Sequence, residues 1–398
     1  MKVVMVGPFG LRPRGTMARR ALPLGKALTA RGHEVEVLLP PWSCPEESGR
    51  AWEEDGVGIH NIVLPTRVPL VREMLITWRL LRRALATRPD VVHCFKPKAY
   101  AGLTAAALWW LGKLGLGKVR LVVDSDDWEG WGGWNEMGGY SWVERRFFAW
   151  QERWGMTHCH ALTLASKTLE RLALEMGIDR DALHYLPNGV GTESEVSDTD
   201  LRREVRDRWQ LGDDAVILLY TRFFEFEAQR LLSILGRVWS QEPSARLLVV
   251  GRGLLGEEER FLACAQEAGL SSRLTYVGWA QEDELPGYFA ASDVAVCPFE
   301  DTLLNRARCP AKLADLMAAG LAVVADDVGQ AGEYIDHLVS GYLVPPGGVE
   351  AFATGVVQLL RDEKLRAALG MEARQRVTKE FGWPELAKVV ESAYAAQS

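Results

Sequence analysis

Residues 309–327, "CPAKLADLMAAGLAVVADD", join a short helix to a short buried strand. Pro310 suits the first helical position, where its missing N–H costs nothing, and Gly320 suits the position just past the helix end. The apolar run "LAVVA" that follows is typical of an inner strand of a parallel sheet. Lys312 and Asp315, three residues apart, share a separate helix face. The stretch therefore predicts a helix–strand unit of an α/β domain with two charged side chains near its start.

The same alternation of helix and strand runs along the chain and pauses once. The polar stretch 191–211 separates two series, so we predict an N-terminal domain (1–190), this linker, a C-terminal domain (212–380) and a last helix (381–398) that crosses back to the first domain. The predicted strands are "KVVMVG", "EVEVLLP", "DVVHCF", "RLVVDS", "ALTLAS" and "LHYLPNG" in the first series, and "AVILLYTR", "ARLLVVG", "LTYVGW", "VAVCPF", "LAVVADD" and "GYLVPP" in the second.

The predicted fold class is α/β, with two Rossmann-like, doubly wound parallel sheets. A chain of 398 residues with 48% hydrophobic content is long and apolar enough for two cores. Two such domains would place the carboxyl ends of their strands, and hence their ligand loops, on either side of a cleft.

Charge and cysteine usage limit the classes of partner and compartment. The net charge of −7 argues against nucleic acid as the main partner, whereas residues 1–100 carry 16 Lys and Arg against 9 Asp and Glu. Six scattered cysteines without a C-x-x-C pair predict neither a disulfide framework nor a zinc site. We expect no signal peptide before "KVVMVG" and no membrane span, because Lys113 and glycines interrupt the longest apolar stretch. A cytoplasmic protein follows.

Several loops of the second domain favour an anionic ligand. The N-terminus of the helix that carries Lys312 offers free N–H groups and a partial positive charge. Arg222 comes directly after the strand "VILLYT", and Gly251 and Gly329 follow other strands of the same series. Together these features predict a diphosphate pocket. The alternative for Lys312 is a surface ion pair with Asp315.

Much of the chain resembles a known family. The segments "RLLVVGRG", "ELPGYFAASDVAVCPF", "PAKLADLMAAGLAVVADDVGQAGEYIDHLVSGYLVPPG", "LASKTLERL" and "YLPNGV" are similar to the group 1 glycosyltransferases of family 4, which have the GT-B architecture. The resemblance implies a retaining hexosyltransferase that moves a sugar from a nucleotide-sugar, a UDP- or GDP-sugar, to a glycan, lipid-linked or small-molecule acceptor held by the first domain. The transfer reaction that the resemblance implies requires no further cofactor and no metal. The resemblance also implies a role in making cell-envelope polysaccharide or glycolipid.

The resemblance also assigns donor-site residues. It implies that Arg222 binds the diphosphate, and it expects a nearby lysine where this chain has Glu227. Family members carry two glutamates eight residues apart; here the ribose-side position is Asp315 and the sugar-side position is Ala307. The substitutes for the lost groups come from "LLNRARCPAK". The predicted donor-binding residues are Gly15, Arg222, Gly251, Gly278, Asn305, Arg306, Lys312, Asp315, Gly329 and Glu333, with Arg308 a further candidate for the diphosphate.

In the first domain, Gly15 lies where the family has a glycine pair near the phosphates, with Arg12 or Arg14 adding charge. The stretch "VVDSDDWEGWGGW" carries three aspartates after a strand, and the alternative of a D-x-D metal site stays open there. The resemblance favours Asp126 and Asp127 as catalytic side chains, beside Arg222 and Lys312, with one of the two aspartates orienting the acceptor hydroxyl.

Aromatic side chains and one histidine are candidates for the acceptor side. Trp128 and Trp131 could stack on a sugar, and the alternative is simple packing. His93, at the end of "DVVHCF", is predicted to line the cleft. Residues 71–90 form a basic amphipathic helix whose arginines could rest on anionic lipid or face solvent, so peripheral membrane contact is a further prediction.

Other function classes remain as alternatives. The missing glutamate and lysine would also fit a non-catalytic GT-B protein that binds a nucleotide or glycan without transferring it. An epimerase or phosphorylase of the same architecture has no support in the motifs. An NAD dehydrogenase is disfavoured because no G-x-G-x-x-G opens either half.

Overall fold

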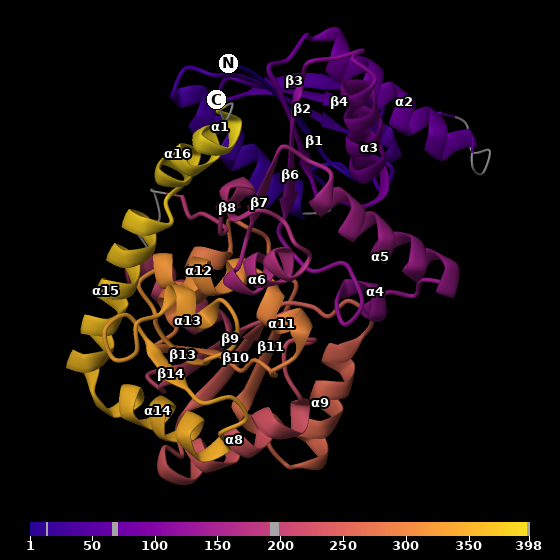
Figure 1. Cartoon of the computed structure of the whole chain (residues 1–398). Coiled ribbons are helices and arrows are strands. Elements are labelled where there is room, and N and C mark those ends of the chain that lie inside the picture. Colours follow the sequence, from indigo (N-terminus) through magenta and orange to yellow (C-terminus); the bar gives the residue numbers. More distant parts are fainter. Residues whose placement is uncertain (13–14, 66–70, 192–198, 396–398) are drawn as a thin grey trace. The chain divides into compact units, whose positions relative to one another are not determined.

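The computed structural model describes residues 1–12, 15–65, 71–191 and 199–395 (Figure 1). Arg14 and the stretch 192–198 of the predicted linker therefore lie outside the described residues. The chain divides into two compact units. Unit 1 comprises Met1–Gly189, Ala307–Cys309 and Trp383–Ser398, and unit 2 comprises Val190–Arg306 and Pro310–Gly382.

Unit 1 is built on an eight-stranded sheet with the order β3-β4-β2-β1-β5-β6-β7-β8. All neighbouring strands run parallel except β3 and β4, which form an antiparallel hairpin at one edge. The strands are β1 (Lys2–Val6), β2 (Glu34–Leu39), β3 (Ala51–Glu54), β4 (Val57–Asn61), β5 (Val91–Phe95), β6 (Arg120–Ser125), β7 (Ala161–Leu164) and β8 (Leu183–Tyr185).

Helices cover both faces of this sheet, so its inner strands are apolar on both sides. In β1 every residue after Lys2 is buried, and Val3 pairs with Val35 on one side and Val91 on the other. Helices α1 and α16 pack together, whereas α3 packs against α2 and α5 (Figure 1). The helices are η1 (Met17–Ala21), α1 (Leu22–Ala30), η2 (Pro45–Glu47), α2 (Val71–Ala86), α3 (Ala99–Lys113), α4 (Trp134–Met137), α5 (Trp142–Thr157), α6 (Lys167–Glu175), η3 (Arg180–Ala182) and α16 (Trp383–Tyr394).

Unit 2 has a six-stranded, wholly parallel sheet with the order β11-β10-β9-β12-β13-β14. The strands are β9 (Val216–Tyr220), β10 (Arg246–Val250), β11 (Leu274–Gly278), β12 (Val294–Cys297), β13 (Ala322–Asp326) and β14 (Tyr342–Val344). The helices are α7 (Thr199–Arg208), α8 (Ala228–Gln241), α9 (Glu257–Glu267), η4 (Ser271–Arg273), α10 (Leu285–Ala291), α11 (Leu303–Ala307), α12 (Ala311–Ala318), α13 (Ala331–Tyr334), α14 (Val349–Arg361) and α15 (Glu363–Glu380).

The core of unit 2 explains why these segments take their places. The apolar faces of α8, α9 and α14 meet the Val- and Leu-rich strands β9, β10, β12 and β13 in one buried cluster. Residues 199–208, which the sequence placed in the linker, form α7, and α7 packs on α10. Arg206 of α7 is buried and pairs with Asp293 at 2.9 Å.

All twelve predicted strands are present, and the α/β prediction is confirmed. The β3–β4 hairpin was missed, because its short strands, AWEE and VGIHN, mix apolar with polar residues instead of forming an apolar run. Within the described residues no helix has the length and apolar character needed to span a bilayer.

Candidate functional site

The strand order of the unit 2 sheet reverses between β9 and β12. Open α/β sheets bind ligands beyond the carboxyl ends of their strands at such a switch point. Arg222 lies there, two residues after the end of β9. The next residue, Phe223, has φ of +68°, a left-handed conformation that a bulky side chain rarely adopts. This strained turn is a local feature of the kind that clusters at ligand sites.

Glu225 organises the turn that carries Arg222. Its buried carboxylate accepts the backbone N–H of Arg222 at 3.0 Å and the hydroxyl of Thr221 at 2.8 Å. The Lys312 Nζ lies 3.9 Å from the same carboxylate and 5.3 Å from the ring centroid of Tyr220. The Arg222 Nε is buried and has no hydrogen-bond partner among the described residues. The fold thus brings together Arg222 and Lys312, which lie 90 positions apart in the sequence.

Lys312 lies in the first turn of α12, and Asp315 follows one turn later; both are half-buried. The helix begins at Ala311, so the prediction that Pro310 occupies the first helical position is wrong by one residue. With ψ of 83°, Pro310 is outside the helical region and forms the N-cap. Gly320 follows the helix end with φ of +76°, as predicted.

Asn305 and Arg306 are predicted to replace the missing family glutamate and lysine. The two side chains have different surroundings. The Asn305 side chain is buried and donates to the carbonyls of Glu225 at 2.9 Å and Glu300 at 2.8 Å, so it ties the β9 loop to the β12 loop. Its Oδ1 has no hydrogen-bond partner in the described part of the chain. Arg306 is more exposed and forms a two-pronged ion pair with Asp301.

Close backbone packing explains two of the predicted glycines. A Cβ at Gly251 would lie 1.9 Å from the carbonyl oxygen of Thr221, and one at Gly329 would lie 2.5 Å from that of Arg306. Gly278 has φ of +82° and accepts the N–H of Gly251 at 2.8 Å. These glycines let the loops at the carboxyl edge of the sheet approach one another.

The remaining predicted positions of unit 2 lie near the same edge. Glu333 is half-buried in α13, a helix of one turn that follows β13. Glu227, where the family has a lysine, is exposed at the N-cap of α8. In the first turn of α8, Arg230 forms a bidentate ion pair with the buried Asp326 at 2.6 and 2.9 Å. Arg230 therefore neutralises a carboxylate of the sheet itself.

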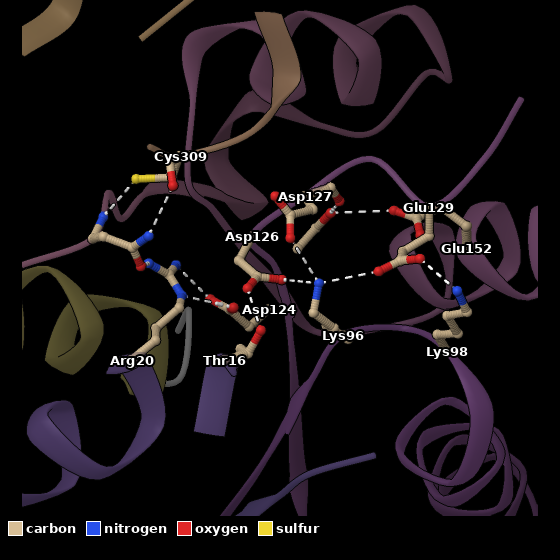
Figure 2. Close-up of polar contacts among 12 residues, drawn as sticks. Thr16, Arg20, Lys96, Lys98, Asp124, Asp126, Asp127, Glu129, Glu152 and Cys309 are labelled. Atoms are coloured by element: carbon tan, nitrogen blue, oxygen red, sulfur yellow. Dashed lines mark hydrogen bonds and ion pairs between the residues drawn. The ribbon is translucent and has the colours of Figure 1, made fainter. Parts of the chain in front are cut away.

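Unit 1 has its own switch point, between β1 and β5, and a dense ionic cluster lies there (Figure 2). Lys96 follows β5 in a left-handed conformation, φ +58°. Figure 2 shows its ammonium pointing into a group of carboxylates, and the Nζ lies 3.0 Å from Asp126, 2.9 Å from Asp127 and 3.0 Å from Glu129. Lys98 pairs with the other oxygen of Glu129 at 2.6 Å.

A second buried pair supports the same loop. Arg20, fully buried in η1, makes a bidentate ion pair with Asp124 of β6 at 2.7 and 2.8 Å. Its guanidinium also donates to the backbone carbonyl of Leu186 at 2.6 Å. Thr16 donates its hydroxyl to Asp126 at 2.5 Å. The loop after β1 and the loop after β6 are thereby locked together.

Burial and neighbouring charges shift the pKa values of the carboxyl groups in this cluster in different directions. Burial raises the pKa of Asp127 to about 6; the negative charges of Asp126 and Glu129 add to this effect and Lys96 opposes it. For Asp126 the attraction of Lys96 and Arg20 outweighs burial and lowers the pKa. Two neighbouring carboxyl groups with separated pKa values are a frequent feature of reactive sites.

The aspartates of the possible D-x-D metal site pair with cationic side chains of the protein. Asp124 pairs with Arg20, and Asp126 and Asp127 pair with Lys96, so protein cations lie where a metal ion would. No group of three or more possible ligands with a metal-binding arrangement occurs within the described ranges.

Gly15 opens the helix that follows β1. Its carbonyl accepts the backbone N–H groups of Ala18 and Arg19 at 3.1 and 3.0 Å, and a Cβ there would lie 3.0 Å from the ring of Phe9. Arg12 forms a close ion pair with Glu47. A free charge at Arg12 is therefore not part of the candidate site.

His93 requires a correction. It is fully buried in β5, with one ring nitrogen 2.9 Å from the Tyr394 hydroxyl and the other 3.2 Å from the Thr163 hydroxyl. Burial, together with the charge of Arg20, lowers its pKa to about 3. The prediction that His93 lines a cleft is wrong, because a buried strand residue of this kind packs within unit 1.

The two predicted tryptophans differ in their burial and contacts. Trp128 is half-buried, donates its Nε1–H to the carbonyl of Trp131 at 2.8 Å, and lies so close to Gly130 and Gly133 that a Cβ at either would collide with it. Trp131 is 48% exposed. Trp128 therefore shapes its own loop, whereas Trp131 offers a ring face to solvent.

The sequence reasoning missed several residues that hold these sites: Arg20, Lys96, Lys98, Glu129, Glu152 and Glu225. A usable signal did exist for Lys96, since it directly follows a predicted strand. Arg20 gave no such signal, because one arginine in "TMARRALPL" resembles a solvated helix residue.

Comparison with known proteins gives independent evidence about the family of this chain. Residues 15–189 match the family model described as "Glycosyl transferase 4-like domain", and residues 215–362 match "Glycosyl transferases group 1". A GDP-mannose-dependent alpha-(1-6)-phosphatidylinositol monomannoside mannosyltransferase of Mycobacterium tuberculosis is 30% identical over 227 residues, 56% of this chain and 58% of that protein. The protein of the same description from Mycolicibacterium smegmatis is 26% identical over 89% of this chain and 88% of its own length.

Solved structures share the fold at low sequence identity. Sucrose-phosphate synthase from Thermosynechococcus elongatus superposes with a TM-score of 0.76 at 19% identity, covering 99% of this chain and 98% of that one. The catalytic domain of starch synthase IV from Arabidopsis thaliana gives 0.75 at 15% identity, covering 98% of both chains. The predicted GT-B architecture is thereby confirmed, and with both family matches the chain belongs to the group 1 glycosyltransferases of family 4.

Proposed function

We propose that this enzyme transfers a hexose, with retention of configuration, from a nucleotide-sugar bound by unit 2 to an acceptor bound by unit 1. The observation that carries the proposal is the grouping of Arg222 and Lys312 at the switch point of the unit 2 sheet, with the Arg222 Nε buried and unsatisfied among the described residues. Both family matches favour this catalytic interpretation over a GT-B protein that only binds its ligand.

The chemistry needs positive charge where the nucleoside diphosphate leaves. As the glycosidic bond to the diphosphate breaks, negative charge grows on the phosphate oxygens. Arg222, Lys312 and the N-terminus of α12 would stabilise that charge from fixed positions, with no metal ion required. Glu225 holds both the Arg222 backbone and the Lys312 side chain, which reduces the reorganisation that binding requires.

Further residues of unit 2 complete the proposed donor site. Asp315 would accept hydrogen bonds from the ribose hydroxyls, and Glu333 beside Gly329 would hold the donor. The free acceptor oxygen of Asn305 is suited to a sugar hydroxyl, at a place where the family glutamate is replaced by Ala307. Because the mannosyltransferase relatives are described as GDP-mannose-dependent, we propose GDP-mannose as the donor, with UDP-sugars as the alternative.

On the acceptor side, Asp126 and Asp127 are proposed to orient the attacking hydroxyl, and Trp131 to stack on a sugar ring. The Asp127 side chain is 21% exposed, so a substrate can reach it. The relatives' names point to a glycolipid acceptor such as a phosphatidylinositol mannoside. We further propose that the protein works in the cytoplasm, at the membrane, where the exposed Met74 and Trp78 of α2, flanked by arginines, would touch anionic lipid.

A ligand-binding and transfer experiment tests this function. In a thermal-shift panel of GDP-mannose, UDP-glucose and UDP-N-acetylglucosamine, a donor at 100 times its Kd should stabilise the protein by about 2.7 kcal/mol. Arg222→Ala should abolish the shift, whereas Arg237→Ala, an exposed arginine of α8, should preserve it. Radiolabelled donor with mannosylated phosphatidylinositol should then give product. No shift with any donor, or an unimpaired Arg222→Ala enzyme, would refute the proposal.

A further inference from the structure

A row of aromatic rings runs along the exposed side of α5. Trp142, Phe147 and Trp150 are 67%, 40% and 52% exposed, although each is large and apolar. Phe147, Trp150 and Trp154 are spaced three and four residues apart, so they share one face of the helix. Glu152 and Met156, on the opposite face of the helix, are buried inside unit 1. The exposed rings are therefore not part of the core.

The row continues from α5 onto α3. Successive ring centroids lie 5.9 Å apart for Phe147 and Trp150, 6.2 Å for Trp150 and Trp154, and 4.3 Å for Trp154 and His158, which are stacked. His158 then meets Trp109 of α3 edge to face at 5.7 Å. The result is one continuous aromatic strip across two neighbouring helices.

The strip ends at a basic pocket of about 360 Å³ beside the C-terminus of α3. Its lining includes Trp109, Lys113, Lys118, Arg120 and His160, and no carboxylate. The Lys113 Nζ lies 4.8 Å from the centroid of the Trp109 ring. Such a pocket suits the phosphate of an anionic headgroup.

Apolar side chains project beside this pocket. Trp110, Leu114 and Leu116 are 58%, 69% and 72% exposed. Residues 91–123 contain no Asp or Glu, although the whole protein has a net charge of −7. Arg146 and Arg153 add positive charge on α5 beside the aromatic strip. Exposed Trp, Phe and Leu beside Lys and Arg are the composition of a surface that rests in the interface of an anionic membrane.

We propose that this α3–α5 surface, formed by Trp109, Trp110, Lys113, Leu114, Lys118, Arg146, Phe147, Trp150, Arg153 and Trp154, docks on bilayers that contain anionic phospholipid. Its residues lie on α3, on α5 and between α3 and β6, and none of them belongs to α2. Arg120 begins β6 and lines the pocket, whereas Asp126 and Asp127 follow the other end of that strand. A strand of this length spans roughly 20 Å. The basic pocket and the acceptor residues therefore lie at opposite ends of one strand, and the proposal does not depend on which donor or acceptor the enzyme uses.

Vesicle co-sedimentation of the full chain tests the proposal. The protein should bind vesicles of phosphatidylcholine mixed with phosphatidylglycerol, should not bind phosphatidylcholine alone, and should be released by salt. The double variants Phe147→Ser/Trp150→Ser and Lys113→Ala/Lys118→Ala should each weaken binding by about tenfold or more. Leu255→Ser and Lys364→Ala, exposed positions in unit 2, are the matched controls and should bind as the unaltered chain does.

Other results would overturn the proposal. Equal binding to both kinds of vesicle, or full binding by both double variants, would remove the α3–α5 surface as the docking site. Inorganic phosphate that displaces the protein at millimolar concentration would identify a site for a soluble anion. A dimer of the unaltered chain that becomes monomeric in Phe147→Ser/Trp150→Ser would identify a protein interface. Thermal unfolding temperatures equal to that of the unaltered chain show that the variants are folded.

Discussion

Replacing Lys96 with methionine should destabilise unit 1 strongly. The ammonium is buried within 3.0 Å of three carboxylates, and methionine keeps the length of the side chain but removes its charge. Breaking a buried ion pair by removing one partner costs about 3–5 kcal/mol, because the other charge remains buried and unpaired. Lys98 stays near Glu129 and limits the loss there. We therefore expect Lys96→Met to lower the free energy of unfolding by about 4 kcal/mol at pH 7.

The pH dependence of this loss follows from the carboxyl groups. Lys96 opposes burial and lowers the pKa of Asp126 and Glu129 in the folded state, so the stability they contribute is present at neutral pH and is lost as the pH falls through those lowered values. Without Lys96 these groups take up protons at higher pH, and protonation relieves the unpaired charge. The difference between Lys96→Met and the unaltered chain should therefore shrink as the pH falls below about 5.

Urea unfolding followed by tryptophan fluorescence at several pH values measures both effects. Lys167→Met removes a lysine whose side chain is 56% exposed in its pair with Glu170, and it should cost less than about 1 kcal/mol. A loss below about 1 kcal/mol in Lys96→Met, or one that grows toward acid pH, would show that Lys96 does not neutralise the carboxylates as described.

Three further predictions concern catalysis and the loops. Arg222→Ala should lower kcat by about 10²- to 10³-fold, measured with radiolabelled donor, because one fixed group that stabilises the leaving diphosphate is lost; unchanged turnover would remove that role. If Asp127 must be ionised to orient the acceptor, kcat/KM should rise as the pH increases through about 6, and Asp127→Asn should lack this limb in its pH–rate profile. Gly251→Ala should lower stability by more than about 2 kcal/mol in urea unfolding, since the new Cβ would meet the Thr221 carbonyl oxygen at 1.9 Å, whereas Gly236→Ala in α8 has open space and should be neutral or stabilising.

Local patterns predicted most of the architecture correctly. Apolar runs of Val and Leu located the strands, because an inner strand of a parallel sheet must be apolar on both faces. The glycine after α12 marked the helix end for a similarly local reason: Gly320 takes a left-handed conformation that other residues resist. The β3–β4 hairpin was missed because alternate residues of both strands are exposed or only partly buried, so neither strand forms an apolar run.

The sites were predicted less completely. Arg222 and Lys312 were proposed because each stands at the end of a strand or the start of a helix, which the sequence reveals, and their site roles remain predictions. His93 stands at a similar place in β5, yet it faces the interior, where Tyr394 and Thr163 take up its ring nitrogens. Nothing in the local pattern indicates which of the two faces of a strand a polar residue occupies.

The sequence by itself determined the α/β class, the two series of strands and the family, since periodicity and short motifs are local properties of the chain. Only the tertiary structure decided which charges compensate one another. Arg20 meets Asp124 across 104 positions, and Lys96 meets Glu129 across 33. These partners are set by the order of strands in the sheet, and their energies depend on burial. A buried charge requires a partner, and the fold alone determines which residue is close enough to provide it.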